Sequence, residues 1–225
     1  MKCLIFDTGS IISLALNDLL WILPKLKEKF GGEFIIPRSV KKELVETPLG
    51  SKKYELEAIM ISKLIRDKVI RVYEENIDVR ELEETINNIY SINNKPLHIV
   101  QTAELEALIL AIKLDASAYV VDERTIRLVV ENPDNLRLIL ENKLHTKVQI
   151  NNSILKNLKG ELKEINIIRS IELALVSLEK GILDQFIGNS ITKKKLVDSL
   201  LWGFKLRGCA ISTEEIDEVL DSIKN

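Results

Sequence analysis

Apolar residues in this chain form short, unbroken runs that are separated by longer amphipathic segments. The first run ends at Asp7, and a later one, 118–122, ends at Asp122. Short apolar runs without alternation are typical of strands that are buried on both faces of a parallel sheet. The pattern therefore predicts five strands, which lie just before Asp7 and at 33–37, 68–73, 118–122 and 165–168.

The segments between these runs carry apolar residues at helical spacing, most clearly within 103–114. Strands that are separated by helices imply a parallel α/β sheet with right-handed crossovers. The remaining helices are predicted at 10–16 with Thr8 or Ser10 as cap, at 18–30 with a kink at Pro24, and at 40–46 with Ser39 as cap and a stop before Pro48. Further helices are predicted at 54–67, at 81–90, as two pieces within 132–164, and from 170 to the end, with a loop at 91–96.

Composition and charge limit the classes of protein to which the chain can belong, but they do not indicate a particular function. The chain has 225 residues, 46% of them apolar, and a net charge of −2, which excludes a grossly basic nucleic-acid binder but not a local basic groove. We expect one domain over 1–180, with an insertion at about 132–164, and a helical extension over 181–225. The apolar stretch 11–23 is interrupted and too short to span a bilayer, so we expect a cytoplasmic protein without membrane contact.

Four acidic residues are candidates for a shared site. Asp7 and Asp122 each follow a predicted strand, while Glu43 and Glu106 lie near the starts of two predicted helices. If those helix starts face the carboxyl edge of the sheet, the acids converge there, and such a cluster needs a cation because close like charges raise each other's pKa. Oxygen-only ligands favour Mg²⁺ or Mn²⁺ over Zn²⁺, and such ions support phosphodiester hydrolysis. Ser10 could hydrogen-bond a carboxylate or a water.

Four stretches in order carry a resemblance: Phe-Asp-Thr-Gly-Ser at 6–10, Ile-Pro-Arg-Ser-Val-Lys-Lys-Glu-Leu at 36–44, Ala-Glu-Leu-Glu-Ala-Leu at 103–108 and Val-Asp-Glu-Arg at 121–124. The chain resembles a PIN-domain protein, a family of metal-dependent nucleases. The resemblance implies a three-layer α/β/α fold with a five-stranded parallel sheet, an acidic site for Mg²⁺ or Mn²⁺, and single-stranded RNA as substrate. The C-terminal stretches 169–173, 180–183 and 207–212 are similar to the last helices of an archaeal and bacterial subgroup of that family.

The resemblance also implies roles for individual residues. Asp7, Glu43, Glu106 and Asp122 fall on the acidic catalytic positions, and Ser10 falls on the small hydroxyl position. Three of the acids, Asp7, Glu106 and Asp122, are the expected metal ligands. We add weaker candidates from their position in the chain: Glu104, Ser170 and Glu172 as supporting residues of the site, and Arg124 and Arg127 as contacts to nucleic acid.

Other functions are weighed against a ribonuclease. The segment 7–10 resembles the active-site loop of aspartic proteases, but those enzymes need a second such loop and the sequence has none. A phosphotransferase of the haloacid dehalogenase type needs an acid at position 9, where Gly9 stands, and no glycine-rich phosphate loop is present. The serious alternative is a non-catalytic PIN-like module that binds RNA or protein. This alternative becomes better supported if Glu43 or Glu106 points away from the other acids. A protein partner or inhibitor and a homodimer are compatible with the sequence.

Overall fold

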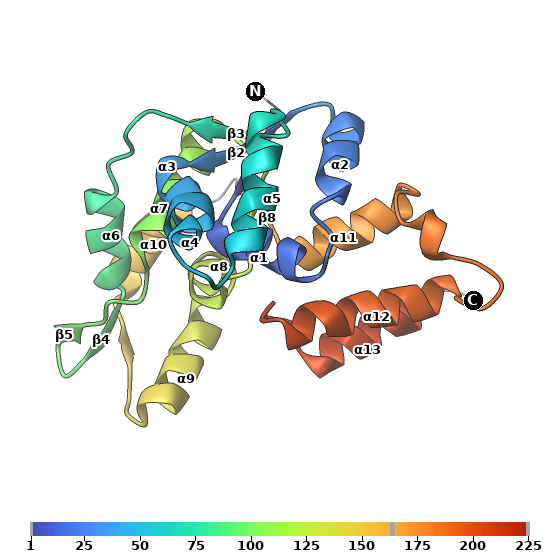
Figure 1. The fold of residues 1–225 in the computed structure, drawn as a ribbon. Helices are drawn as coiled ribbons and strands as arrows, with labels where there is room; N and C mark the ends of the chain where they lie inside the picture. The colour runs from blue at the N-terminus through green and yellow to red at the C-terminus, as the bar shows by residue number, and fades with distance from the viewer. Residues whose placement is uncertain (1, 163–164, 224–225) are drawn as a thin grey trace.

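The structure is a computed structural model that describes residues 2–162 and 165–223. At its centre lies a five-stranded parallel sheet with the strand order β3-β2-β1-β6-β8 (Figure 1). Its strands are β1 (Cys3–Phe6), β2 (Glu33–Pro37), β3 (Ile70–Tyr73), β6 (Ala118–Val120) and β8 (Ile167–Ile168). The predicted central parallel sheet is confirmed.

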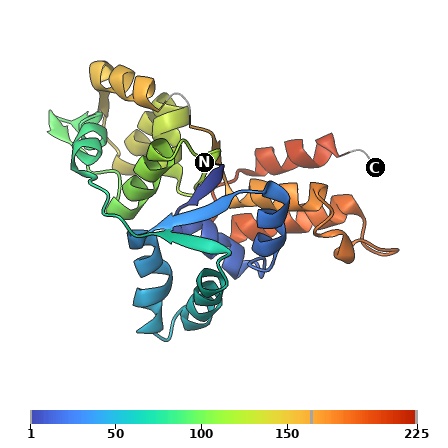
Figure 2. The same cartoon turned by 90° about the horizontal axis from the view of Figure 1, so that it is seen from above.

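Successive residues of the central strand β1 point into two different cores. Leu4 and Phe6 belong to one core, while Cys3 and Ile5 belong to the other. Both faces are therefore buried, which explains why this strand reads as an unbroken apolar run rather than as an alternating one. The three-layer α/β/α arrangement is confirmed, as Figure 2 shows from above.

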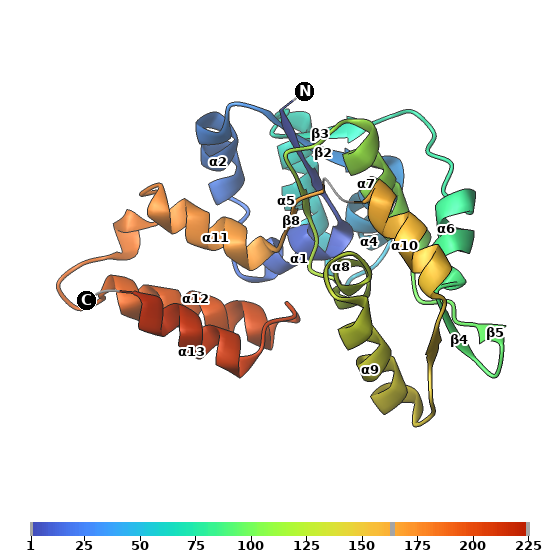
Figure 3. The same cartoon turned by 180° about the vertical axis from the view of Figure 1, so that it is seen from behind.

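Different helices cover the two faces of the sheet, as a comparison of Figure 1 with Figure 3 shows. The first core is closed by α1 (Thr8–Leu16), α2 (Ile22–Phe30), α5 (Glu55–Arg66) and α11 (Ser170–Glu179). The second core is closed by α6 (Arg80–Asn87), α7 (Thr102–Lys113), α8 (Arg124–Glu131) and α10 (Asn152–Glu161). The carboxyl ends of β1 and β6 lie side by side between these layers, because the two strands pair directly.

The first two helices begin at residues other than those predicted. Asp7 rather than Thr8 or Ser10 caps α1, since its side chain accepts a hydrogen bond from the Ser10 amide. The helix predicted at 18–30 begins only at Ile22, because Asp18 has a left-handed backbone (φ 55°) that ends the preceding turn. Pro24 then lies in the first helical turn, where its missing N–H is no loss, so it causes no kink.

The segment after β2 is a continuous helical stretch of three parts: α3 (Arg38–Lys41), the π-helix η1 (Lys42–Glu46) and α4 (Thr47–Leu49). The predicted boundaries were wrong here, because the stretch begins at Arg38 with Pro37 as its cap and runs through Pro48. The amide of Thr47 bonds the carbonyl of Lys42, five residues back. This wider turn accommodates the proline ring that would clash with a carbonyl in a regular α-helix.

A second, smaller sheet replaces the loop that was predicted at 91–96. It has the strand order β5-β4-β7 and is antiparallel. The hairpin turn between β4 and β5 consists of Asn93 and Asn94, which both adopt a positive φ, as asparagine does more readily than most residues. The strands are β4 (Tyr90–Ile92), β5 (Lys95–Pro96) and β7 (Gln149–Ile150), and the helix α9 (Pro133–Leu144) precedes β7.

Three elements follow α11: the short 3-10 helix η2 (Asp184–Phe186), α12 (Lys193–Leu206) and α13 (Thr213–Ser222). Val197, Leu201 and Phe204 of α12 belong to the same core as α1 and α11. The division into a domain at 1–180 and an extension at 181–225 stays a prediction. Within the described ranges, no helix has the length and apolarity needed to cross a membrane.

Candidate functional site

Asp7 lies at the carboxyl end of β1 and is almost fully buried, with 2% of its surface exposed. Its Oδ1 accepts a hydrogen bond of 2.7 Å from the Ser10 amide, and its own amide donates to the carbonyl of Val120 at 3.0 Å. Burial raises the pKa of Asp7 to about 7, and the negative charges of Asp122 and Glu104 add to that rise against the hydrogen bonds from Ser10. A buried carboxyl group of this kind ionises fully at neutral pH only when a cation is near.

Asp122 lies two residues beyond β6 and is also buried, with 6% of its surface exposed. Its Oδ1 accepts from the Ser170 amide at 2.8 Å, and its Oδ2 accepts from the Ser170 hydroxyl at 2.6 Å. Ser170 is the first residue of α11. The structure thus brings together Asp122 and Ser170, which were predicted as a catalytic and a supporting residue.

Gly9 separates the two aspartates, and the sequence analysis assigned it no part in the site. A Cβ atom at this position would lie 3.2 Å from Asp7 Oδ2 and 3.8 Å from Asp122 Cβ. A side chain here would crowd the Asp7 carboxylate, so the glycine allows the helix start to approach both residues closely. The signal in the sequence was a glycine inside the first turn of a helix, where glycine costs stability relative to alanine.

Glu104 and Glu106, two residues apart on α7, have different surroundings at this edge of the sheet. Burial raises the pKa of Glu104 to about 7, and the charges of Glu123 and Glu43 add to the rise. Glu106 instead accepts a hydrogen bond from the Ser39 hydroxyl at 2.5 Å, in contact with the start of α3. Two residues apart on a helix, the side chains project about 200° apart, so the two glutamates reach different parts of this edge.

Glu43 lies on η1 at the exposed rim of the site. Its Oε2 accepts a hydrogen bond of 2.5 Å from the hydroxyl of Thr8, the residue next to Asp7. Its negative charge also contributes to the raised pKa of Glu104. The structure therefore places Glu43 beside the buried acids, and Thr8 is the contact that holds it there.

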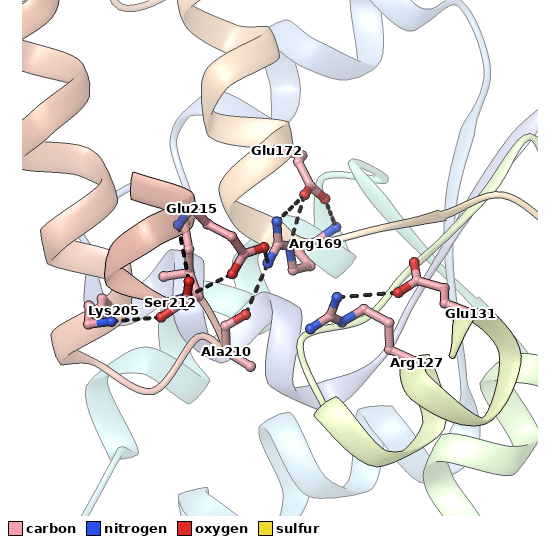
Figure 4. Close-up of polar contacts among 9 residues, drawn as sticks. Arg127, Glu131, Arg169, Glu172, Lys205, Ala210, Ser212 and Glu215 are labelled. Atoms are coloured by element: carbon pink, nitrogen blue, oxygen red, sulfur yellow. Dashed lines mark hydrogen bonds and ion pairs between the residues drawn. The ribbon is translucent and has the colours of Figure 1, made fainter. Parts of the chain in front are cut away.

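The remaining predicted residues lie around this edge but have other partners. Glu172 accepts from Arg169 Nε at 2.8 Å and Nη2 at 2.6 Å (Figure 4). Arg127 Nη1 donates to Glu131 at 3.3 Å, and its buried Nε has no hydrogen-bond partner among the described residues. Arg124 is exposed at the first position of α8.

The oxygen ligands at this edge match one mode of binding a divalent metal ion. Across residues 2–162 and 165–223, no three acidic, histidine or cysteine side chains are gathered closely enough to hold such an ion. Mg²⁺, however, is commonly bound by one or two carboxylates and several waters. Asp7 and Asp122 fit this mode of binding, because both are buried and offer only oxygen ligands, and Gly9 leaves no side chain beside the Asp7 carboxylate.

A family model described as a PIN domain matches residues 3–139, which is more than half of the chain. This chain belongs to the PIN-domain family. The matched part includes Asp7, Glu43, Glu104 and Asp122, and it ends before β8 and Ser170. PIN domains are generally nucleases that use divalent metal ions, so membership indicates a nuclease-type function and nucleic-acid binding in general. Comparisons with curated proteins and with solved structures gave no match.

Proposed function

We propose that this PIN domain is a metal-dependent ribonuclease that hydrolyses phosphodiester bonds of single-stranded RNA. The observation that carries the proposal is the pair of buried carboxyl groups, Asp7 and Asp122, after the ends of two paired strands, with the side-chain-free Gly9 close to both. Burying two acids side by side without a cation is unfavourable, so the arrangement supports a bound Mg²⁺ or Mn²⁺. Such an ion would lower the pKa of a water molecule and neutralise charge on the phosphate.

The residues of the site have separate tasks in this proposal. Asp7 and Asp122 would hold the ion, and Glu104 takes the place that the sequence analysis gave to Glu106 as the third acid. Ser10 fixes one oxygen of Asp7, while Ser170 orients both oxygens of Asp122. Glu43, held by Thr8 at the rim, is placed to orient the attacking water.

The RNA would reach this edge from the side of α8. Arg124 is exposed at the start of α8, two residues after Asp122, and we propose it as a phosphate contact. Arg127 is less suited, because it is half-buried and paired with Glu131. An arginine at the rim would supply charge where the acids otherwise repel the RNA backbone.

The alternative function is a non-catalytic binding module, which would be better supported if Glu43 or Glu106 pointed away from the other acids. The hydrogen bond from Ser39 holds Glu106 beside the start of α3. Glu104, however, supplies a carboxylate from the same helix, so the edge keeps its acidic set. Hydrolysis therefore remains the better supported function, and the alternative becomes an outcome of the following test.

The test is cleavage of a labelled pool of single-stranded RNA with Mn²⁺, with Mg²⁺ and with EDTA. We expect metal-dependent cleavage by the wild type, loss of cleavage in Asp7→Asn and Glu104→Gln, and near-normal cleavage in Glu106→Gln. The two glutamate variants form a matched pair on one helix. Equal traces of cleavage from the wild type and Asp7→Asn would favour the binding module, and loss in Glu106→Gln alone would restore that residue as the third acid.

We also propose that the chain forms a homodimer through the exposed surface of α5. Leu56 and Ile59 on this helix are exposed by 67% and 54%, and Met60 lies beside them at helical spacing. The first turn of α5 is acidic and its last turn is basic, with Glu55 and Glu57 at one end and Lys63 and Arg66 at the other. In an antiparallel pair of α5 helices the apolar stripes would meet, and each acidic end would face a basic one.

Measurement of molar mass by light scattering over a range of concentrations tests this homodimer. We expect the wild type to reach the mass of a dimer and Ile59→Lys to remain a monomer. Leu138→Lys is the matched control, because Leu138 is an exposed apolar residue of α9, away from α5. A wild type that stays monomeric at every concentration would rule out the pairing.

A further inference from the structure

Arg169 joins the start of α11 to the loop and helix that end the chain (Figure 4). Its Nη1 donates to the carbonyl of Ala210 and to Oε1 of Glu215, both at 3.0 Å. Its Nε and Nη2 donate to Glu172, as described above. The side chain of Arg169 is only 12% exposed, so this planar group is a well-anchored connection between α11 and α13.

Glu215 is itself held in place on the C-terminal side. It forms a capping box with Ser212 at the start of α13, and the two residues exchange hydrogen bonds of 2.7 and 3.0 Å. Lys205 of α12 donates to the carbonyl of Ile211 in the same loop at 2.9 Å. The two acceptors of Arg169, the Ala210 carbonyl and the Glu215 carboxylate, therefore lie in and just after a loop between α12 and α13 that is held by its own hydrogen bonds (Figure 4).

The residue next to Arg169 is Ser170, whose amide and hydroxyl hold both oxygens of Asp122. A chain of direct contacts thus leads from Glu215 through Arg169 and Ser170 to Asp122. The C-terminal loop is thereby linked to the buried aspartate.

We propose that Arg169 and Glu215 are positioning residues, by which the C-terminal helices α12 and α13 set the place of Asp122 through Ser170. Two hydrogen bonds from one residue fix the carboxylate only as well as that residue is itself fixed. Ser170 begins a helix, where the backbone frays most readily, and the Arg169 contacts oppose that fraying. The consequence for metal binding and cleavage rests on the ribonuclease proposed above.

The first arm of the test measures the contact itself and needs no enzyme activity. Amide hydrogen exchange of Ser170 is followed by NMR in the full chain for the wild type, Glu215→Gln and Glu214→Gln. Glu214 is the matched control, because it is the exposed neighbour of Glu215 in the same helical turn. We expect Ser170 exchange to accelerate about tenfold in Glu215→Gln and to stay unchanged in Glu214→Gln. Glu215→Asp, which keeps the charge, should give an intermediate rate.

The second arm measures Mn²⁺ affinity by electron paramagnetic resonance and cleavage of RNA. We expect Glu215→Gln to weaken Mn²⁺ binding about tenfold and to lower kcat while KM for RNA stays near that of the wild type. Unchanged Ser170 exchange in Glu215→Gln would overturn the positioning role, and so would an equal acceleration of all core amides. If Ser170 exchange responds but the wild type neither binds Mn²⁺ nor cleaves RNA, the contact is real and the ribonuclease is wrong.

Discussion

Asp7 and Asp122 follow neighbouring strands of one sheet, yet the chain holds them in different ways. Asp7 is bound by the amide of Ser10, three residues later, as part of its own helix start. Asp122 is bound by Ser170, 48 residues later, beyond the helices α8, α9 and α10. Asp7, the local half of the acidic site, is therefore held by its own helix start. Asp122, the distant half, depends on the start of α11, which in turn contacts the loop before α13 and α13 itself through Arg169.

The largest effect on the rate of RNA cleavage is expected at Asp7, the local half of the site. Replacing Asp7 by Asn keeps the cap but removes the charge that would hold the metal ion, so we expect RNA cleavage to fall about a thousandfold or more. The rate is measured with saturating Mn²⁺ on labelled RNA, and circular dichroism confirms the fold. A variant that keeps even a tenth of the wild-type rate would show that Asp7 is not a metal ligand.

The same residue should make stability depend on pH. The pKa of Asp7 rises from an ordinary value of 3.8 to about 7 in the folded state. Between these values the folded protein keeps a proton that the unfolded chain has lost, so the free energy of unfolding falls as pH rises through this window. In metal-free protein the fall should approach about 4 kcal/mol, and urea titrations from pH 4 to pH 8 measure it.

Asp7→Asn serves as the control for that pH dependence. The variant has no carboxyl group to ionise at this position, so its stability should change less between pH 4 and pH 8 than that of the wild type. Glu104, whose pKa is also raised to about 7, should leave a remainder of the same sign. Equal slopes for the two proteins would mean that Asp7 ionises normally in the folded state.

Removing one serine hydroxyl beside each aspartate compares how strongly the two aspartates are held. Ser170→Ala deletes a 2.6 Å hydrogen bond to a buried carboxylate and should lower the free energy of unfolding by about 1.5–3 kcal/mol at pH 8. In Ser10→Ala the amide still binds the Asp7 carboxylate, and only a bond to the Asp7 carbonyl is lost, so we expect about 1 kcal/mol. Urea unfolding measures both, and a larger loss in Ser10→Ala would reverse the contrast.

The smallest effect on stability is expected at Gly9, between the two halves. Alanine there gains helix propensity but places a Cβ 3.2 Å from Asp7 Oδ2, so stability should change by no more than about 1 kcal/mol. Mn²⁺ affinity should nevertheless fall, because the added methyl group crowds the Asp7 carboxylate. Wild-type Mn²⁺ affinity in Gly9→Ala, measured by titration, would show that the ion does not bind beside Gly9.

Most of the sheet could be predicted from the apolar runs, whereas several boundaries could not. The positions of β1 and β6 followed from burial on both faces, which admits hardly a polar residue until the strand ends. The start of α2 at Ile22 depends on the left-handed backbone of Asp18, and the hairpin after Tyr90 depends on two such asparagines. Neither conformation is visible in a pattern of apolar positions.

The acidic site divides in the same manner. That Asp7 and Asp122 would meet at one edge followed from parallel strands whose carboxyl ends coincide. The different surroundings of the two glutamates of α7 did not follow, because each residue turns a helix by about 100° and the rotation of α7 is set by packing against the sheet. Ser170 was a candidate from its place after the last strand, but its partner was not predictable.

The sequence by itself determined the parallel sheet and the two aspartates that end its central strands. A strand buried on both faces must be apolar throughout, and a charged residue can follow only where the strand stops. The tertiary structure decided the partners of the two glutamates of α7 and which serine holds Asp122. Those contacts depend on the rotation of a helix against the sheet and on the return of the chain after 48 residues, and neither leaves a periodic signal in the order of the amino acids.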